Sequence, residues 1–222
     1  MDVYEALYTT RAMRRVRPDP IPLDVQARIL DAAIRAPSGG NSQPWHFLLV
    51  DDPSVKAEIA PLYHDAISRL WDGPYRSQVE AAAADPGTPE SVQFRKIQRS
   101  ANWLGEHFVE VPLFLFPFGR HGGAGAGSIY PAVWSAMLAA RAEGIGSCLT
   151  SVLGAFHLDE TLEILGVPAD EGWTLFGCVS FGYPLGRWGV APRQPVAQVS
   201  SRNRWGAAAG LDTPGPRWPG PS

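Results

Sequence analysis

Apolar positions recur at helical spacing in several stretches of the chain and form continuous runs in others. Residues 2–8 fit a short helix, and residues 24–36 fit an amphipathic helix whose apolar residues fall on one face. Further helices are expected from Asp52-Pro53 onward and over 158–165. Continuous apolar runs predict buried strands at 47–50, 111–118, 147–153 and 173–182. The pattern therefore predicts helices and buried strands within 222 residues, a length that suits one substantial domain.

Residues 63–107 depart from this pattern. They contain Gly73-Pro74, an alanine run at 81–84 and a Pro/Gly-rich loop at 85–89, with helical pieces at 67–71 and 94–107. Such an insert is either a mobile lid or a surface excursion. From Gly206 the chain is rich in Ala, Gly, Pro and Trp. We therefore expect one domain over 1–205 and a flexible tail over 206–222.

The helix predicted over 130–143 has small or apolar residues almost all round, with Ser128 as its expected N-cap. A helix apolar on every side should be buried on every side. In a chain this small, that predicts the centre of a dimer interface. The glycine-rich loop before it, 122–127, lacks both the lysine of a phosphate loop and the Rossmann spacing, which disfavours a nucleotide-phosphate role.

Composition narrows the function classes. Hydrophobic residues make up 45% and charged residues 18%, with a net charge of −3, as in globular proteins. Basic residues cluster only at Arg11, Arg14, Arg15 and Arg17, too locally for a nucleic-acid surface but suitably for one phosphate. Neither a signal peptide nor an apolar run near ~20 residues is evident, so we expect a cytoplasmic protein without a membrane partner. The two cysteines predict buried free thiols, and the five histidines lack the paired spacing of metal ligands.

The most informative segment is Ala36-Pro37-Ser38-Gly39-Gly40-Asn41-Ser42-Gln43-Pro44-Trp45-His46-Phe47. It places turn-forming residues directly before an apolar run, at the mouth of an expected strand. Its glycines allow the backbone to approach a flat ligand, and its polar side chains can bind a ligand edge. An ordinary helix-to-strand turn explains the spacing equally well. The order of residues, however, closely resembles the "APSxxNxQPW" signature of the nitroreductase family of flavin enzymes.

Three further segments resemble the same family in the right order, so the resemblance spans roughly residues 4 to 205. Thr10–Val16 is similar to "RRSxRxF", with Thr10 and Ala12 as departures. Residues 144–151 are similar to the family's "GLG" segment, and Gly182-Tyr183-Pro184 with Arg193-Gln194-Pro195-Val196 is similar to "GyP…RxPl".

The resemblance implies an α+β, nitroreductase-like fold. A central, mostly antiparallel sheet would be flanked by helices in a domain-swapped-type homodimer, with FMN at the interface. Arg11 and Arg193 would bind the phosphate, and Arg14 the N1/O2 edge of the flavin ring. Thr150 and Ser151 are candidate donors to N5, and no dedicated catalytic side chain is expected. The implied cofactor-binding residues are Thr10, Arg11, Ala12, Met13, Arg14, Pro37, Ser38, Gly39, Asn41, Leu149, Thr150, Ser151 and Arg193.

The resemblance further implies an oxidoreductase that uses NAD(P)H in a ping-pong mechanism. The insert resembles the lid of the branch that includes iodotyrosine deiodinase. Ile67, Trp71 and Gly105, however, stand where that enzyme has its Glu, Tyr and Lys clamp, so deiodination is disfavoured. Trp71 and Trp103 favour a flat aromatic acceptor such as a nitroaromatic or a quinone, although such aromatics can equally fill the lid's own core.

Other functions stay open. One family branch fragments its flavin to make dimethylbenzimidazole, but its motif lacks the Asn41-Ser42 pair. A flavin-storing or sensory protein, or a structural dimer without a cofactor, would share many of these features.

Overall fold

A five-stranded antiparallel sheet forms the centre of the protein in a computed structural model, which describes residues 1–120, 125–212 and 215. The strands are β1 (Trp45–Val50), β2 (Leu113–Gly119), β3 (Gly146–Thr150), β4 (Thr174–Leu175) and β5 (Cys178–Gly182). Their order is β1-β2-β5-β3, and β4 pairs with the end of β2. Leu48 lies opposite Phe116, and Cys148 lies opposite Ser180.

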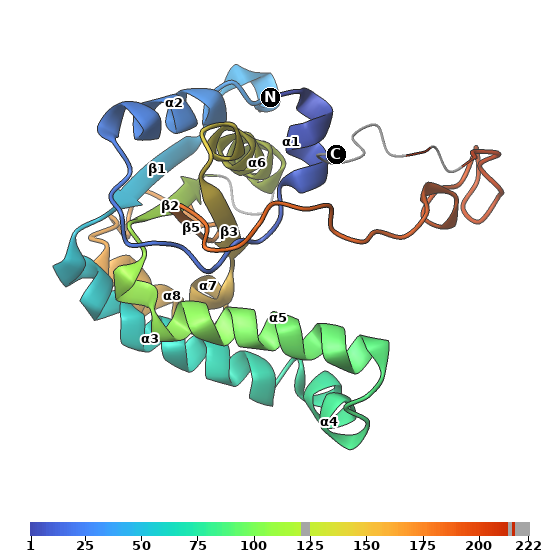
Figure 1. Ribbon diagram of the computed structural model, residues 1–222. Coiled ribbons are helices and arrows are strands. Elements are labelled where there is room, and N and C mark those ends of the chain that lie inside the picture. Colours follow the sequence, from blue (N-terminus) through green and yellow to red (C-terminus); the bar gives the residue numbers. More distant parts are fainter. Residues whose placement is uncertain (121–124, 213–214, 216–222) are drawn as a thin grey trace.

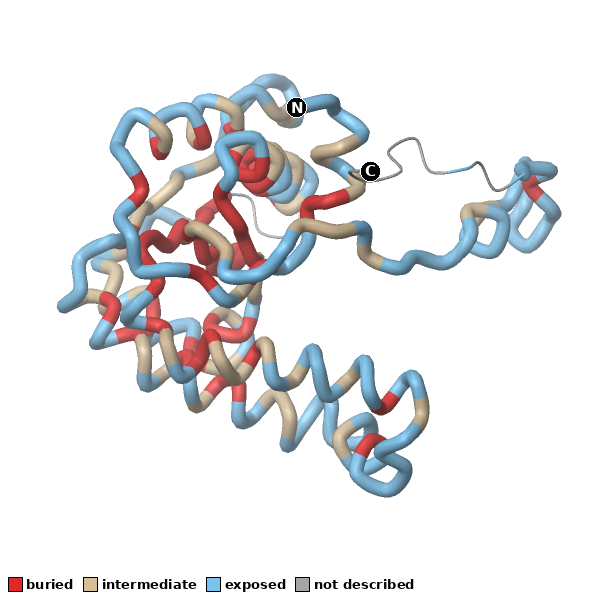
Figure 2. Tube along the Cα trace, in the orientation of Figure 1, coloured by how far each residue is buried: buried red, intermediate tan, exposed pale blue. Residues whose placement is uncertain are grey.

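Strand β2 divides the core into two halves because successive side chains of a strand point to opposite faces. Phe114, Phe116 and Phe118 belong to one apolar cluster, whereas Leu113 and Leu115 belong to the other. Helices α2 (Leu23–Ala33) and α6 (Ala126–Ala142) cover the leucine face. Helices α3 (Pro53–Asp72), α7 (Val152–Phe156) and α8 (Leu158–Ile164) cover the phenylalanine face. Buried residues accordingly concentrate in the sheet and along the inner sides of the helices (Figure 2). The expected α+β fold with a mostly antiparallel sheet is confirmed.

Two of the expected strands are shorter than the apolar runs that predicted them. The run 147–153 forms a strand only to Thr150, and α7 begins at Val152. The run 173–182 is divided into β4 and β5 at Gly177, whose φ of +147° is open mainly to glycine. An apolar run shows that a segment is buried, but it does not separate a strand from a short helix.

The insert 63–107 forms a helical arm that keeps the expected breaks at Gly73-Pro74 and in the loop 85–89, but the alanine run is helical and is not a break. Helix α3 runs unbroken through Pro61 to Asp72, so the piece expected at 67–71 is its last part. The alanine run lies inside α4 (Arg76–Ala84), as the high helix propensity of alanine explains. Helix α5 (Pro89–Glu106) begins after Thr88, whose hydroxyl accepts a hydrogen bond from the Ser91 amide at 3.2 Å. Helix α4 and the adjoining ends of α3 and α5 project beyond the body (Figure 1).

Helix α6 begins earlier than expected and is not buried on every side within one chain. It starts at Ala126, so Ser128 lies inside its first turn, where the Ser128 hydroxyl accepts a hydrogen bond from the Gly39 amide at 3.3 Å. Tyr130 and Trp134 stay 43% and 41% exposed, while the opposite side packs on α2 and the sheet. One apolar stripe of α6 therefore faces outward beside α1 (Val3–Thr9).

Two sequence expectations lie partly outside the described residues. The glycine-rich loop 122–127 begins within 121–124, and much of the tail 206–222 falls at 213–214 and 216–222. The described part of that tail closes a small loop through a bridge between Ser201 and Ala208.

Replacing Gly177 with alanine is expected to lower the free energy of unfolding by about 2–4 kcal/mol and the Tm by about 5–10 °C. A Cβ atom there would lie 2.8 Å from the Thr150 carbonyl oxygen and 2.7 Å from a Leu149 methyl, at a φ of +147°. Thermal unfolding measures the effect. Gly127→Ala is the matched control, since it lies within α6 with open space around it and should leave the Tm unchanged or raise it slightly. Equal Tm values for the two variants would contradict the strain assigned to Gly177.

Candidate functional site

Backbone hydrogen bonds hold the N-terminal segment 11–17 against the edge of the sheet, and they thereby set the position of Arg14. The Met13 amide donates to the Ser147 carbonyl at 2.9 Å, and the Arg17 amide donates to the Tyr183 carbonyl at 2.8 Å. Two glycines allow this close approach. A Cβ on Gly146 would lie 2.8 Å from that of Met13, and one on Gly182 would lie 2.7 Å from that of Val16. The segment therefore holds Arg14 beside β3 without requiring a carboxylate partner.

Arg14 faces a pocket of about 290 Å³ between β3 and the helical arm. Its polar side consists of Arg14, Tyr63, Thr150 and Ser151, which come from the N-terminal segment, α3 and the end of β3. The remaining lining is mostly apolar and comes from α3, the α3–α4 turn, α5, β3 and α7: Ile67, Leu70, Trp71, Tyr75, Phe94, Ile97, Ala101, Leu149 and Val152. One end of the pocket is thus charged and hydrogen-bonding, and the rest suits a flat apolar ligand.

Several polar groups around this pocket lack partners. Tyr63 Oη and Thr150 Oγ1 are buried next to each other, and neither has a further partner within the described residues. Thr10 Oγ1 is also buried without a partner there, but Thr10 does not line the pocket. Arg14 likewise forms no ion pair in that part of the chain. A buried hydroxyl without a partner costs free energy, so such groups usually face a ligand or ordered water. The two hydroxyls that line the pocket and the unpaired Arg14 fit a ligand with anionic and hydrogen-bonding edges.

Burial sets the protonation of the groups beside Arg14. It raises the pKa of Tyr63 well above its ordinary value, so this phenol stays neutral and can donate a hydrogen bond. Burial also raises the pKa of the Cys148 thiol, and the positive charge of Arg14 only partly opposes this effect. Arg14 therefore carries a formal charge among neutral groups.

An aromatic cluster forms the outer wall of the pocket. The Trp71 ring meets Phe94 edge-on at 6.0 Å and Tyr75 at 5.7 Å between ring centroids. Trp71 Nε1 donates to Asn102 Oδ1 at 2.7 Å, which fixes the indole. These contacts give a rigid apolar surface opposite the polar side of the pocket.

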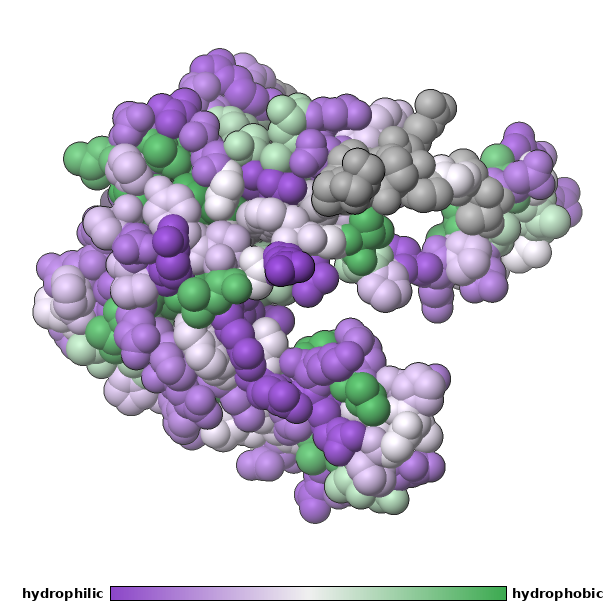
Figure 3. Space-filling view, viewed as in Figure 1, coloured by the Kyte–Doolittle hydropathy of each residue, from purple (hydrophilic) through white to green (hydrophobic). Residues whose placement is uncertain are grey.

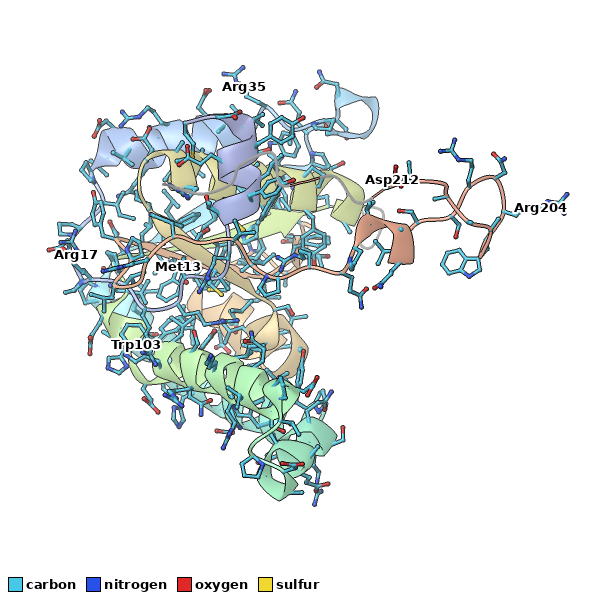
Figure 4. The ribbon with its side chains drawn as sticks, turned by 45° about the vertical axis from the view of Figure 1, so that its right-hand side comes forward. Met13, Arg17, Arg35, Trp103, Arg204 and Asp212 are labelled. Atoms are coloured by element: carbon cyan, nitrogen blue, oxygen red, sulfur yellow. The ribbon has the colours of Figure 1, made fainter. Side chains whose placement is uncertain are left out.

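Trp103, the other expected acceptor residue, lies elsewhere. It lines a second cleft of about 350 Å³ on the neighbouring side of α5, together with Arg15, Arg95, Gln98, Arg99, Asn102 and Glu106. One face of its indole is covered by His107, which stacks on it at 4.2 Å. Trp103 lies where α5 meets the body, below Met13 and Arg17 (Figure 4). The molecular surface is hollowed between the body and the helical arm (Figure 3).

The loop of the "APSxxNxQPW" signature does not reach this pocket within one chain. The Gly39 amide donates to Ser128, which holds the loop at the start of α6. The loop is ordered by its own contacts: Ser38 Oγ accepts from the Gln43 amide at 3.1 Å, and Asn41 Oδ1 accepts from Gln43 Nε2 at 3.3 Å. Gly40, Asn41 and Gln43 all have positive φ. Pro37, Gly39 and Asn41 are exposed, and Ser38 is half-buried.

The expected phosphate arginines are also apart from the pocket lining. Arg11 is exposed and lies near Gly189 of the C-terminal segment. Arg193 is exposed further along that segment, where its guanidinium donates to the Pro192 carbonyl at 2.9 Å. Beyond about residue 190 the C-terminal segment leaves the body as an extended arm (Figure 1), with Arg204 at its far end and Asp212 where the chain runs back toward the body (Figure 4). Within one chain the structure thus brings Arg14, Leu149, Thr150, Ser151 and Trp71 together and leaves the other expected site residues outside.

The sequence analysis does not identify the two lining tyrosines, Tyr63 and Tyr75, as pocket residues. Tyr63 does follow Ile59 and precedes Ala66 and Ile67 at helical spacing, which marks it as inward-facing but not as a pocket residue.

Comparisons with known proteins agree with this fold. The family model described as "Nitroreductase family" matches residues 7–183. An NADH dehydrogenase from Thermus thermophilus is 28% identical over 211 residues, covering 90% of this chain and 95% of that protein. A 5,6-dimethylbenzimidazole synthase from Rhodospirillum rubrum is 31% identical over 193 residues, covering 82% of each. The crystal structure of the FMN-dependent nitroreductase NfnB from Mycobacterium smegmatis in complex with NADPH superimposes with a TM-score of 0.66 at 24% identity, covering 90% of this chain and 97% of that one. The chain therefore belongs to the nitroreductase family of flavoprotein oxidoreductases.

No group of three or more His, Cys, Asp or Glu residues within the described ranges could hold a metal ion. None of the described helices is both long and apolar enough to cross a membrane.

Proposed function

We propose that the protein is an FMN-dependent oxidoreductase that takes reducing equivalents from NAD(P)H and passes them to a flat aromatic acceptor. The observation that carries this proposal is the pocket where unpaired Arg14 meets the buried hydroxyls of Tyr63 and Thr150, which have no partner beyond each other, opposite an aromatic wall. The related NfnB named above is FMN-dependent and was solved with NADPH, which supports the same cofactor and reductant here.

The residues present fit FMN. Arg14 would hold the pyrimidine edge of the ring, where a fixed positive charge favours the reduced flavin. Thr150 and Ser151 supply hydroxyls at the end of β3 for the N5 edge, and Arg11 and Arg193 would bind the phosphate. When bound, FMN would supply hydride transfer at N5. The protein's own residues would orient the ligand and exclude water, so no catalytic side chain is required.

The acceptor would lie against the aromatic wall. Trp71, Tyr75 and Phe94 offer an apolar surface without a charged group, which favours a nitroaromatic or a quinone over a zwitterionic amino acid. The arm formed by α4 and the ends of α3 and α5 would act as a lid over this side of the site.

The proposal includes a homodimer with two shared sites. The outward faces of α1 and α6 expose Val3, Leu7, Tyr130 and Trp134, an apolar patch of the kind that pairs with a second copy. The Arg14 pocket of one chain has a volume of about 290 Å³, at the lower limit of ligand pockets, which span roughly 300–1,000 Å³. A single chain therefore offers little room to enclose a cofactor together with an acceptor. The signature loop lies far from its own Arg14 pocket, so it would complete the pocket of the partner.

Anaerobic titration of the purified protein with NADPH and with NADH tests the proposed activity. We expect the visible flavin band to bleach and then to recover on addition of a nitroaromatic or a quinone. A yellow protein that neither nucleotide bleaches would instead indicate a flavin-storing or sensory role. A colourless protein that cannot be reconstituted with FMN would contradict the proposal altogether.

A further inference from the structure

The second cleft, beside the flavin pocket, is positively charged and its cations are unpaired. Arg15, Arg95 and Arg99 line it together with Gln98, Asn102 and Trp103. Within the described residues none of the three arginines forms an ion pair, although Arg95 donates to the Pro86 carbonyl. The one carboxylate in the lining is Glu106. The cleft therefore presents more positive charge than its own residues neutralise.

The spacing of Arg95 and Arg99 does not stabilise helix α5. Arg95 and Arg99 are four residues apart on α5, so their like charges lie on adjacent turns and destabilise the helix. The exposed pairs elsewhere in the chain show the opposite arrangement: Arg28 with Asp24, Arg35 with Asp31 and Arg76 with Glu80 are all oppositely charged at this spacing. An arginine pair without a carboxylate is explained by an anionic ligand rather than by stability of the free protein.

The cleft and the flavin pocket are separate cavities that are lined by neighbouring residues of the same two elements, the N-terminal segment and α5. Arg14 lines the pocket and Arg15 lines the cleft, so consecutive residues serve both. On α5, Ile97 and Ala101 face the pocket while the next residues, Gln98 and Asn102, face the cleft. Asn102 lies between the two, because it lines the cleft while its Oδ1 accepts from Trp71 Nε1 of the pocket wall. A ligand whose ring lies in the pocket could therefore place an anionic end in the cleft.

We propose that this cleft binds the 2′-phosphate of NADPH and makes the enzyme prefer NADPH to NADH. This inference rests on the proposed use of a nicotinamide nucleotide at the Arg14 pocket. Such a nucleotide has a flat ring at one end and adenosine at the other, and only NADPH carries a terminal phosphate there. A phosphate close to doubly charged accepts several hydrogen bonds, which suits the guanidinium forks of Arg95 and Arg99. The Trp103 indole gives the adenine an apolar neighbour.

Calorimetric titration of the FMN-loaded protein with 2′,5′-ADP and with AMP tests the site without requiring turnover. The two probes differ only in the 2′-phosphate. We expect 2′,5′-ADP to bind at least about tenfold more tightly than AMP, and R95A/R99A to remove this difference. Because the arginines are exposed, the preference should also weaken as salt is raised. Lys96→Ala is the matched control, since it removes a positive charge from the same helix outside the cleft.

Steady-state kinetics give a second measurement. In R95A/R99A, kcat/KM for NADPH should fall about tenfold while kcat/KM for NADH changes little. Equal losses for both nucleotides would overturn the 2′-phosphate assignment and indicate the pyrophosphate instead. Equal binding of 2′,5′-ADP and AMP by the wild type, or unchanged binding in R95A/R99A, would overturn the site. If one of these results is found while NADPH still bleaches the flavin, the phosphate site is wrong but the proposed oxidoreductase activity is not. Failure of the site can therefore be distinguished from failure of the proposed function.

Discussion

Replacing Arg14 with alanine is expected to weaken FMN binding by about 10- to 100-fold, since a hydrogen bond to a charged group contributes about 1.5–3 kcal/mol. Arg14 is the unpaired cation of the pocket, held in place by the Met13 amide on one side and the packing of Val16 on the other. Its loss leaves Tyr63 and Thr150 to bind the ligand without a charge. The midpoint potential of the bound flavin should fall as well, because the fixed positive charge that favours the reduced form is absent.

Titration of the flavin-free protein with FMN, followed by a redox titration, measures both effects. Arg17→Ala is the control. Arg17 lies three residues along the same segment, but it pairs with Asp19 at 3.0 Å and is not part of the pocket. Arg14→Lys should restore most of the potential and only part of the affinity, since lysine keeps the charge without the planar fork. Wild-type FMN affinity in a folded Arg14→Ala protein would show that this arginine does not bind the cofactor.

The sequence predicted the strands β1 and β2 well because the signals for them are local. The runs that became β1 and β2 are short, apolar and bounded by turn residues, which makes a buried strand the natural expectation. The end of β3 could not be predicted in the same way. Leu149, Val152 and Leu153 are all apolar, yet the chain changes from strand to helix after Thr150. Apolar character alone does not encode that change.

The pocket was harder to predict than the fold because its members meet only through tertiary packing. Tyr63 and Thr150 are far apart in sequence, and no local pattern indicates that their hydroxyls lie together beside Arg14. The separation of Trp71 from Trp103 has a similar origin. Trp71 lines the pocket, whereas Trp103 points from α5 into the arginine-lined cleft. Asn102, the residue before Trp103, lies between the pocket and the cleft. A sequence shows two aromatic residues in one insert, but not which face of the helix each one occupies.

Truncation after residue 189 is expected to abolish both the homodimer and flavin binding. Up to that point the C-terminal segment is anchored to its own body: the Leu185 amide donates to the Arg15 carbonyl at 3.0 Å, and Trp188 lies 4.0 Å from the guanidinium of buried Arg141. Beyond it the arm exposes Val199 at 63% and Trp205 completely. An extended arm that leaves its own body and carries a fully exposed tryptophan is expected of an exchanged segment, which would gain its stability from a second copy.

Light scattering after size-exclusion chromatography and the flavin content of the purified protein test this arm directly. Arg193→Ala separates its two roles, since it should keep the dimer while weakening FMN binding, as expected of a phosphate contact. Truncation after Leu211 is the matched control, because it keeps the Ser201–Ala208 loop and should change neither property. A dimer with normal flavin content in the protein ending at 189 would show that the arm is dispensable. A monomer that still binds FMN would contradict the proposed shared site, in which the signature loop of one chain completes the Arg14 pocket of the other.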